Sequence, residues 1–332
     1  NSLGSFVWAK QMGGSGSDIS YCIKLDAGSN VYTTGEFSGM GDFNPGAAVF
    51  NMTSVGSVDA FISKLDVSGN FVWAKQIGST GIDVGYSVAF DPGGNIYWTG
   101  DFQLLADFDP GAGTFNMTSF GSYDIFIDKL DASGNFVWAK QIGGLSADQP
   151  LGIAIDASGY IYTGGIFQGT SDFDPGAGTF TLTAVAGSDV FISKLDGVGN
   201  FIWAGQIGGA GSDQGNSIAV DASNNIYTTG RYTATADFDA GIGTYTLTPA
   251  GVGDIFVTKY CPGIPLQPSS ISGLNTMCAN NGATSYSVAT VAGATSYTWA
   301  LPGGWSGTSA TNTISATPGT SGVFTVTATN AC

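Results

Sequence analysis

The stretch FVWAK occupies residues 6–10, 71–75 and 136–140, and its variant FIWAG occupies residues 201–205. The motif therefore returns every 65 residues without drift. An aspartate that ends one predicted strand and an aspartate that opens a DFDPG-type loop keep the same step. A fixed period of this length indicates repeated supersecondary units that stack on one another.

Each repeat predicts a four-stranded meander. In the second copy, four short runs are rich in β-branched and aromatic residues and are bounded by turn residues, at 86–90, 95–102, 124–130 and 135–142. The sequences DPGGN and DASGN supply hairpin turns, and the longer link over 106–123 predicts an extra hairpin. One such unit corresponds to one blade of a β-propeller.

The order of the strands predicts how the propeller ends. The chain begins with a single outer strand at 6–12, runs through three complete units, and stops after the inner three strands of a fourth at Tyr260. Where the next FVWAK is due, residues 266–270 read LQPSS. Pairing the first strand with the last would close a four-bladed ring and hide an exposed sheet edge. The alternative is a fragment of a larger ring with further blades upstream.

The composition changes at Cys261. The segment CPGIPLQPSS is rich in proline, and no charged residue occurs from Gly263 to Cys332. Alternating runs separated by Gly and Pro turns predict a small all-β sandwich with Trp299 in its core. We therefore expect an all-β chain with a propeller over 1–261, a linker over 262–270 and a β-sandwich over 271–332.

The chain contains four cysteines. Cys278 and Cys332, near the start and at the end of the predicted sandwich, could join its first and last strands in an oxidising, extracellular compartment. Cys22 and Cys261 are expected at opposite ends of their blades, beyond the roughly 7 Å that a disulfide spans between Cα atoms. The sequence therefore favours the bridge between Cys278 and Cys332.

The charge balance excludes several classes of function. With 25 acidic and 9 basic residues, the net charge of −16 repels phosphate backbones, so we expect no nucleic-acid partner. Histidine, the commonest general base and transition-metal ligand, is absent. No stretch of the sequence has the length and hydrophobicity of a membrane-spanning helix, so we expect no membrane insertion.

The acidic residues follow the repeat. All but Glu36, Asp101 and Asp128 fall on six repeated positions. Carboxylates at the first and third positions of the DFDPG loops could bind a hard cation such as Ca²⁺, or could simply fix Asx turns. The candidate metal ligands are Asp42, Asn44, Asp107, Asp109, Asp172, Asp174, Asp237 and Asp239. Paired carboxylates also occur in glycosidases, but a catalytic site normally breaks internal symmetry, so we expect no enzyme.

Residues that break the repeat are candidates for one specific binding site. Trp98 replaces a threonine found at 33, 163 and 228, and one shared position carries Glu36, Asp101, Ile166 and Arg231. An exposed tryptophan beside carboxylates could stack on a sugar ring. The candidate ligand-binding residues are Trp98, Asp101, Glu36 and Arg231. The alternative for Trp98 is that it fills space between blades.

Two resemblances extend this interpretation. The motifs FVWAKQIGG, IAIDASGYIYTGG, DFDPGAGTF and DIFIDKLDASGN resemble the SBBP family of β-propeller repeats of bacterial secreted and cell-surface proteins, over residues 1 to about 260. Residues 278–332 look like the PKD-like, immunoglobulin-type modules of surface proteins exported by the type IX pathway. The resemblance implies export and surface placement. The family name implies seven blades, and four repeats depart from that count.

The sequence thus predicts a non-enzymatic secreted or cell-surface protein. Its propeller would present loops for adhesion to an extracellular glycan or protein, with the sandwich as a spacer. The alternative is a structural subunit of an extracellular filament or sheath, whose partners are copies of itself.

Overall fold

The structure is a computed structural model that describes residues 4–241, 243–261, 270–274, 282–291, 294 and 296–329. All regular structure in this part of the chain is β. Contacts divide the chain into two units, one of Asn1–Val220 with Tyr227–Thr258 and one of Asp221–Ile226 with Lys259–Cys332. The predicted linker falls largely on residues outside the described ranges. The described residues contain no helix long and apolar enough to cross a membrane.

Each 65-residue repeat folds into an antiparallel sheet whose strands follow one another along the chain. The first sheet contains β2 (Asp18–Leu25), β3 (Val31–Phe37), β6 (Asp59–Leu65) and β7 (Phe71–Ile77). The second contains β8 (Val84–Phe90), β9 (Ile96–Phe102), β12 (Asp124–Leu130) and β13 (Phe136–Gly144). The third contains β14 (Gln149–Ile155), β15 (Ile161–Asp172), β16 (Thr181–Leu195) and β17 (Phe201–Gly209). The fourth contains β18 (Gln214–Val220), β19 (Ile226–Tyr232) and β22 (Asp254–Tyr260).

The strands predicted for the second copy are β8, β9, β12 and β13, with ends that agree to within two residues. The extra hairpin is also present, as β10 (Leu105–Asp107) paired with β11 (Asn116–Thr118). The matching elements in the other repeats are β4 (Met40–Asp42) with β5 (Asn51–Thr53), the adjoining parts of β15 and β16, and β20 (Ala236–Asp237) with β21 (Thr246–Leu247). The sequence therefore predicts the strands of a repeat correctly.

A glycine fixes the register within each sheet. In the second sheet the pairing of β8 with β9 shifts between Gly85 and Ser87, opposite Gly100. A Cβ at Gly100 would overlap the carbonyl oxygen of Val84, so only glycine allows the two strands to approach this closely. The same shift occurs in the first and third sheets.

A backbone link joins each repeat to the next. The glycine that ends an outer strand pairs with the aspartate that opens the next DFDPG-type loop, 29 residues later. The pairs are Gly13 of β1 (Gly13–Gly14) with Asp42, Gly78 with Asp107, Gly143 with Asp172, and Gly208 with Asp237. Successive sheets are thus hydrogen-bonded to one another at their outer ends.

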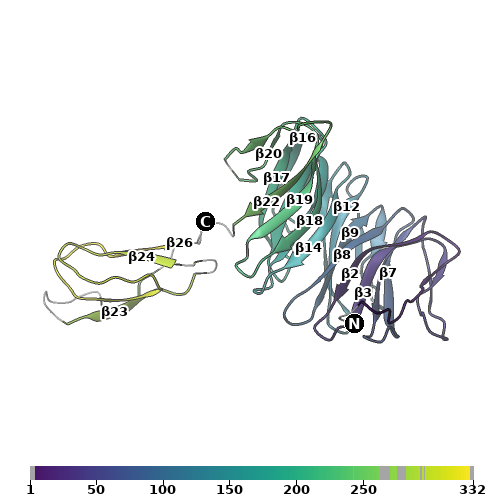
Figure 1. Cartoon of the computed structure of the whole chain (residues 1–332), viewed down its shortest axis with the longest axis horizontal. Helices are drawn as coiled ribbons and strands as arrows, with labels where there is room; N and C mark the ends of the chain where they lie inside the picture. The colour runs from purple at the N-terminus through teal and green to yellow at the C-terminus, as the bar shows by residue number, and fades with distance from the viewer. Residues whose placement is uncertain are drawn as a thin grey trace. The chain divides into compact units, whose positions relative to one another are not determined.

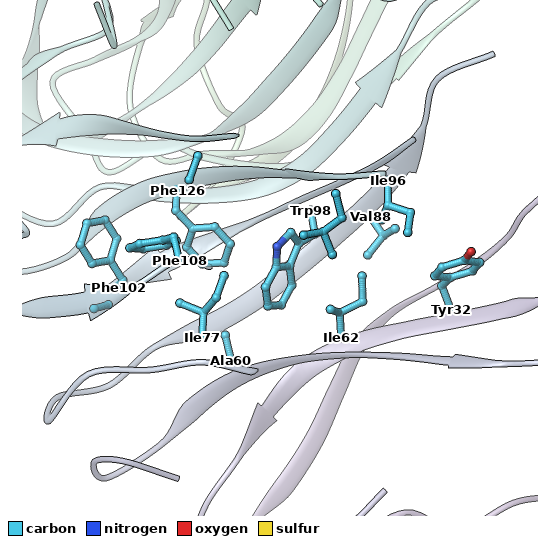
Figure 2. Packing of buried hydrophobic residues seen from close by; sticks show 13 residues of the cluster. Tyr32, Ala60, Ile62, Ile77, Val88, Ile96, Trp98, Phe102, Phe108 and Phe126 are labelled. Carbon is cyan, nitrogen blue, oxygen red and sulfur yellow. The ribbon is translucent and has the colours of Figure 1, made fainter. Parts of the chain in front are cut away.

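Apolar side chains fill the space between successive sheets. Ile62 of the first sheet, with Val88 and Trp98 of the second, belongs to one buried cluster (Figure 2). Ile127 of the second sheet and Ile153 of the third belong to the next cluster. Within the repeat unit the sheets follow one another in chain order, so β2 and β22 lie at opposite ends of the row (Figure 1).

The N-terminal segment differs from the prediction. Residues 6–12 form no strand, although their sequence matches that of β7 and β13. Among the described strands, β22 pairs only with β19. The expected pairing of the first strand with the last is therefore absent from this structure. A strand needs a hydrogen-bonded neighbour, and the sequence of residues 6–12 alone does not supply one.

The C-terminal unit contains two small sheets. One pairs β23 (Thr284–Ser287) with β25 (Thr313–Ala316), and the other pairs β24 (Ser296–Ala300) with β26 (Thr325–Thr329). Trp299 packs against a cluster built on Tyr286 and against a second cluster built on Tyr297. Trp299 therefore lies in the core between the sheets, as predicted, and its indole Nε1 donates to the carbonyl oxygen of Thr311 at 2.9 Å.

Two of the four cysteines belong to the described residues. Cys22 is a free thiol and Cys261 is disulfide-bonded, so these two are not paired with each other. Cys278 and Cys332 lie outside the described ranges. A bond from Cys261 to either of them would exclude the predicted bridge between Cys278 and Cys332.

Candidate functional site

Two of the four predicted ligand-binding residues lie in one polar cluster. Glu36 on β3 is hydrogen-bonded to Tyr21, whose ring centre lies 5.3 Å from that of Tyr86. Tyr86 is hydrogen-bonded to Asp101, which also accepts a 2.7 Å bond from Nε2 of Gln149. Because Gln149 opens β14, the cluster joins side chains of the first three sheets.

Burial sets the electrostatics of this cluster. Asp101 is fully buried, and its Oδ1 has no hydrogen-bond partner. Loss of hydration raises the pKa of Asp101 to about 7, and hydrogen bonds from Gln149 and Tyr86 offset only part of that effect. Burial also raises the pKa of Glu36. The cluster can therefore hold a proton near neutral pH, but Asp101 offers no surface to a ligand.

The prediction that Trp98 binds a ligand is wrong. Its side chain is fully buried between the first and second sheets, where it packs edge-on against Phe126 (Figure 2). The alternative, that Trp98 fills space between repeats, is correct. Arg231 lies apart from the cluster, exposed on β19, where its guanidinium donates to the carbonyl oxygen of Val252 at 3.4 Å.

Sequence reasoning missed Tyr21, Tyr86 and Gln149. A signal was present for the tyrosines, because they occupy one repeat position that carries Leu151 and Asn216 in the other two copies. The repeat comparison had singled out only the position of Glu36 and Asp101. It gave no indication that a side chain from the next repeat, Gln149, completes the cluster.

The DFDPG-type loops have the geometry of Asx turns. In the third copy, Oδ1 of Asp172 accepts from the backbone N–H groups of Asp174 and Phe180 at 3.0 and 2.8 Å. Oδ1 of Asp174 in turn accepts from the N–H of Gly176 at 2.8 Å. The same bonds hold the loops that contain Asp42 and Asn44, Asp107 and Asp109, and Asp237 and Asp239.

The donor set of these loops bears on the calcium prediction. Hydrogen bonds from the backbone N–H groups of Phe50 and Asn44 hold the pKa of Asp42 below its ordinary value. In the described part of the chain, no three acidic, cysteine or histidine side chains form a cluster that could hold a metal ion. The loop carboxylates therefore already act as acceptors for the backbone, and a calcium site there stays a prediction.

Shallow grooves recur beside these loops. One, of about 330 Å³, is lined by Phe115, Gln141, Asp172 and Asp174, among others. The residues 65 positions later, Phe180, Gln206, Asp237 and Asp239, line a groove of about 450 Å³. Each groove lies between the hairpin and outer strand of one repeat and the DFDPG-type loop of the next.

Comparison with known protein families supports the repeat interpretation. The β-propeller repeat known as SBBP matches residues 72–101, 137–165 and 202–238. A PKD-like domain matches residues 264–332. The chain therefore carries SBBP β-propeller repeats followed by a PKD-like domain.

Two curated relatives share part of this sequence. An uncharacterized WD repeat-containing protein, L264, of Acanthamoeba polyphaga mimivirus is 26% identical over 220 residues, which are 57% of this chain and 16% of the relative. The regulatory protein FlaEY of Caulobacter vibrioides is 26% identical over 175 residues, which are 52% of this chain and 18% of the relative. The matched region thus spans less than a fifth of either relative.

Proposed function

We propose that this chain of β-propeller repeats followed by a PKD-like domain is a non-enzymatic secreted or cell-surface protein. Its repeat loops bind an extracellular glycan or protein, and the PKD-like domain serves as a spacer. The observation that carries the proposal is the recurrence of one groove at successive repeat boundaries, lined by Phe115, Asp172 and Asp174 in one case and by the equivalent residues in the next.

The chemistry of the grooves suits a carbohydrate. Phe115 and Phe180 each keep more than a third of their surface exposed at the groove, which is enough to offer part of an aromatic ring to a sugar face. The backbone bonds of Asp174 use Oδ1, so Oδ2 is the atom that could accept from a ligand hydroxyl. Repeated weak grooves reach useful affinity when a polymeric ligand engages several of them at once.

Two further observations support the extracellular and non-enzymatic parts of the proposal. The disulfide at Cys261 suits an oxidising compartment. The acidic groups with the most strongly raised pKa values, such as Asp101 and Asp128, are fully buried, so they do not face a substrate.

A glycan array tests the proposal. We expect selective binding by the full chain, and a loss of at least about tenfold in affinity for Phe115→Ala combined with Phe180→Ala. Asp174→Asn combined with Asp239→Asn keeps the turn acceptors and should weaken binding without lowering the melting temperature. Val67→Ala, an exposed valine that lines neither groove, is the matched control. Absence of selective binding, or equal binding by all variants, would overturn the proposal.

A structural subunit of a filament or sheath is the second candidate function. The uncovered outer faces of the first and fourth sheets favour it, because they leave apolar side chains such as Ile23 and Ile255 in solvent. A four-bladed ring, closed within one chain by residues 6–12, is the intramolecular way to cover the same faces.

A further inference from the structure

The outer face of the fourth sheet is uncovered. Ile255 and Val257 on β22 are 85% and 74% exposed. The residues at the same two positions of the first three sheets are fully buried: Ala60, Ile62, Ile125, Ile127, Val190 and Ile192. Each of these pairs lies on the side of its sheet that packs against the following sheet, which the fourth sheet lacks.

The opposite face of the first sheet is uncovered in the same way. Ile23 on β2 is 65% exposed, whereas Val88, Ile153 and Ile218, at the same position of the later sheets, are buried. Val88 shares its core cluster with Ile62 of the preceding sheet. The faces carrying Ile23 and Ile255 are therefore the two halves of one interface that the chain builds three times internally.

The N-terminal segment lies where an outer strand of a preceding sheet would lie. A Cβ built on Gly69 would meet the Trp8 ring at 3.2 Å, just as one built on Gly134 would meet the Trp73 ring at 3.0 Å. Gly13 then makes the same backbone link to Asp42 that ends each later outer strand. Residues 6–12 thus present a strand sequence, already docked on the first sheet, that lacks only a strand beside it.

Side chains of the two ends are complementary as well. In the first three repeats the phenylalanine of the outer strand packs on an aromatic residue of the hairpin, with ring centres 4.9, 5.1 and 4.8 Å apart. In the fourth repeat the hairpin carries Tyr245, which is 65% exposed, and the matching strand residue is Phe6, which is 82% exposed. Gln76 donates to Asp59 at 3.0 Å, and the equivalent residues are Gln11 and Asp254.

We infer that the two ends bind each other between copies of this chain, head to tail. Residues 6–12 and the face of β2 in one copy cover β22 in the next, with Phe6 against Tyr245. A second copy is the occupant because the first and fourth sheets lie at opposite ends of the row within one chain, and a further copy continues the row with the internal step (Figure 1). Such a heterologous contact gives a filament, or a closed ring of copies if the rotation closes. The inference rests on the second candidate function and is independent of glycan binding.

Cross-linking of mixed copies tests the inference. In the first sheet Ile62 lies opposite Lys75, so the same register places Lys10 opposite Val257. Neighbouring antiparallel strands bring such Cα atoms within the range of a disulfide. In a Cys22→Ser background we expect a Lys10→Cys chain mixed with a Val257→Cys chain to give a cross-linked dimer on oxidation. Ile255→Cys, two residues out of register, is the matched control and should cross-link poorly with Lys10→Cys.

Solution mass gives an independent measurement. Light scattering of the full chain should show species of at least twice the chain mass, with a population that grows with concentration. Val257→Lys should return the chain to a monomer, whereas Val198→Lys, an exposed valine in a hairpin turn, should not. A monomer at every concentration would overturn the inference. So would a Lys10→Cys, Val257→Cys double variant that forms its bond only within one chain. Neither result would affect glycan binding.

Discussion

The indole Nε1–H of Trp98 donates a 2.7 Å hydrogen bond to Oδ2 of Asp128 on the neighbouring strand, in the core between the first two sheets. At the same two positions the first sheet has Thr33 and Ser63, with hydroxyl oxygens 2.7 Å apart. Two departures from the repeat are therefore one event: a large donor and a carboxylate replace a pair of hydroxyls.

We expect Asp128→Ser to destabilise the chain. It restores the residue of the first repeat but leaves the indole N–H buried without an acceptor, at a cost of about 1–3 kcal/mol in the free energy of unfolding. Urea denaturation measures the change. Asp128→Asn is the control, because its amide oxygen still accepts from Trp98, and it should stay within about 1 kcal/mol of the parent. Equal stability of the two variants would contradict the assigned role of Asp128.

The free energy of unfolding should fall as the pH rises from about 4 to 7. Burial raises the pKa of Asp101 and Asp148 to about 7 and that of Asp83 and Asp189 to about 6. The folded state therefore binds protons more tightly than the unfolded state, so this stability is complete below the unfolded pKa and is lost through pH 6 to 7. Melting temperatures across this range measure the effect, and Asp101→Asn should flatten its upper part.

Stability should also fall in stronger acid. Backbone and side-chain hydrogen bonds from Asn135 lower the pKa of Asp131, and those from Asn70 act in the same way on Asp66. A lowered folded pKa contributes stability that is present above the unfolded pKa and is lost as the pH falls through the folded value. The two groups of carboxylates together predict a maximum of stability near pH 4 to 5. A maximum above pH 7 would contradict the assignment of the raised pKa values.

Gly100→Ala should be strongly destabilising. The added methyl group would overlap the carbonyl oxygen of Val84 across the bulge, and relieving that overlap requires a backbone shift that costs about 3 kcal/mol or more. Gly251→Ala is the matched control: a Cβ there meets nothing within 4 Å, and the change should lie within about 0.5 kcal/mol of zero. Denaturation midpoints compare the two. A tolerated Gly100→Ala would mean that the strands separate more easily than this register implies.

Calcium should leave the melting temperature unchanged, because the loop carboxylates already accept from backbone N–H groups. Asp172→Ala removes the acceptor of two such bonds and should cost about 1–3 kcal/mol, whereas Asp172→Asn keeps Oδ1 and should cost little. Melting curves with calcium and with a chelator provide the measurement. A calcium-induced rise that disappears in Asp174→Asn would instead establish the metal site.

Peptide mapping without reduction should find Cys22 as a free thiol and Cys261 in a disulfide. Alkylation before digestion labels only the free thiol, which gives the internal control. A bridge between Cys278 and Cys332, with Cys261 unlinked, would support the pairing predicted from the sequence.

The strands of a repeat were predictable because their alternation and their turn residues are local. The turn role of Asp91 and Asp131 was predictable for the same reason, and both accept from the asparagine four residues later. Local sequence failed where the outcome depends on a neighbour. FVWAK is strand β7 at 71–75 but no strand at 6–10, because only the former has a partner. Trp98 was placed in a binding site because alternation does not say which face another sheet will cover.

The link from Gly78 to Asp107, and its equivalents in the other copies, has an evolutionary consequence. Since every boundary between repeats uses the same pair of positions 29 residues apart, unequal recombination that inserts or deletes one 65-residue block would create no new type of contact. Both products of such an exchange would keep all their boundaries intact. Lineages carrying this gene can therefore vary in repeat number by duplication alone, without waiting for compensating substitutions.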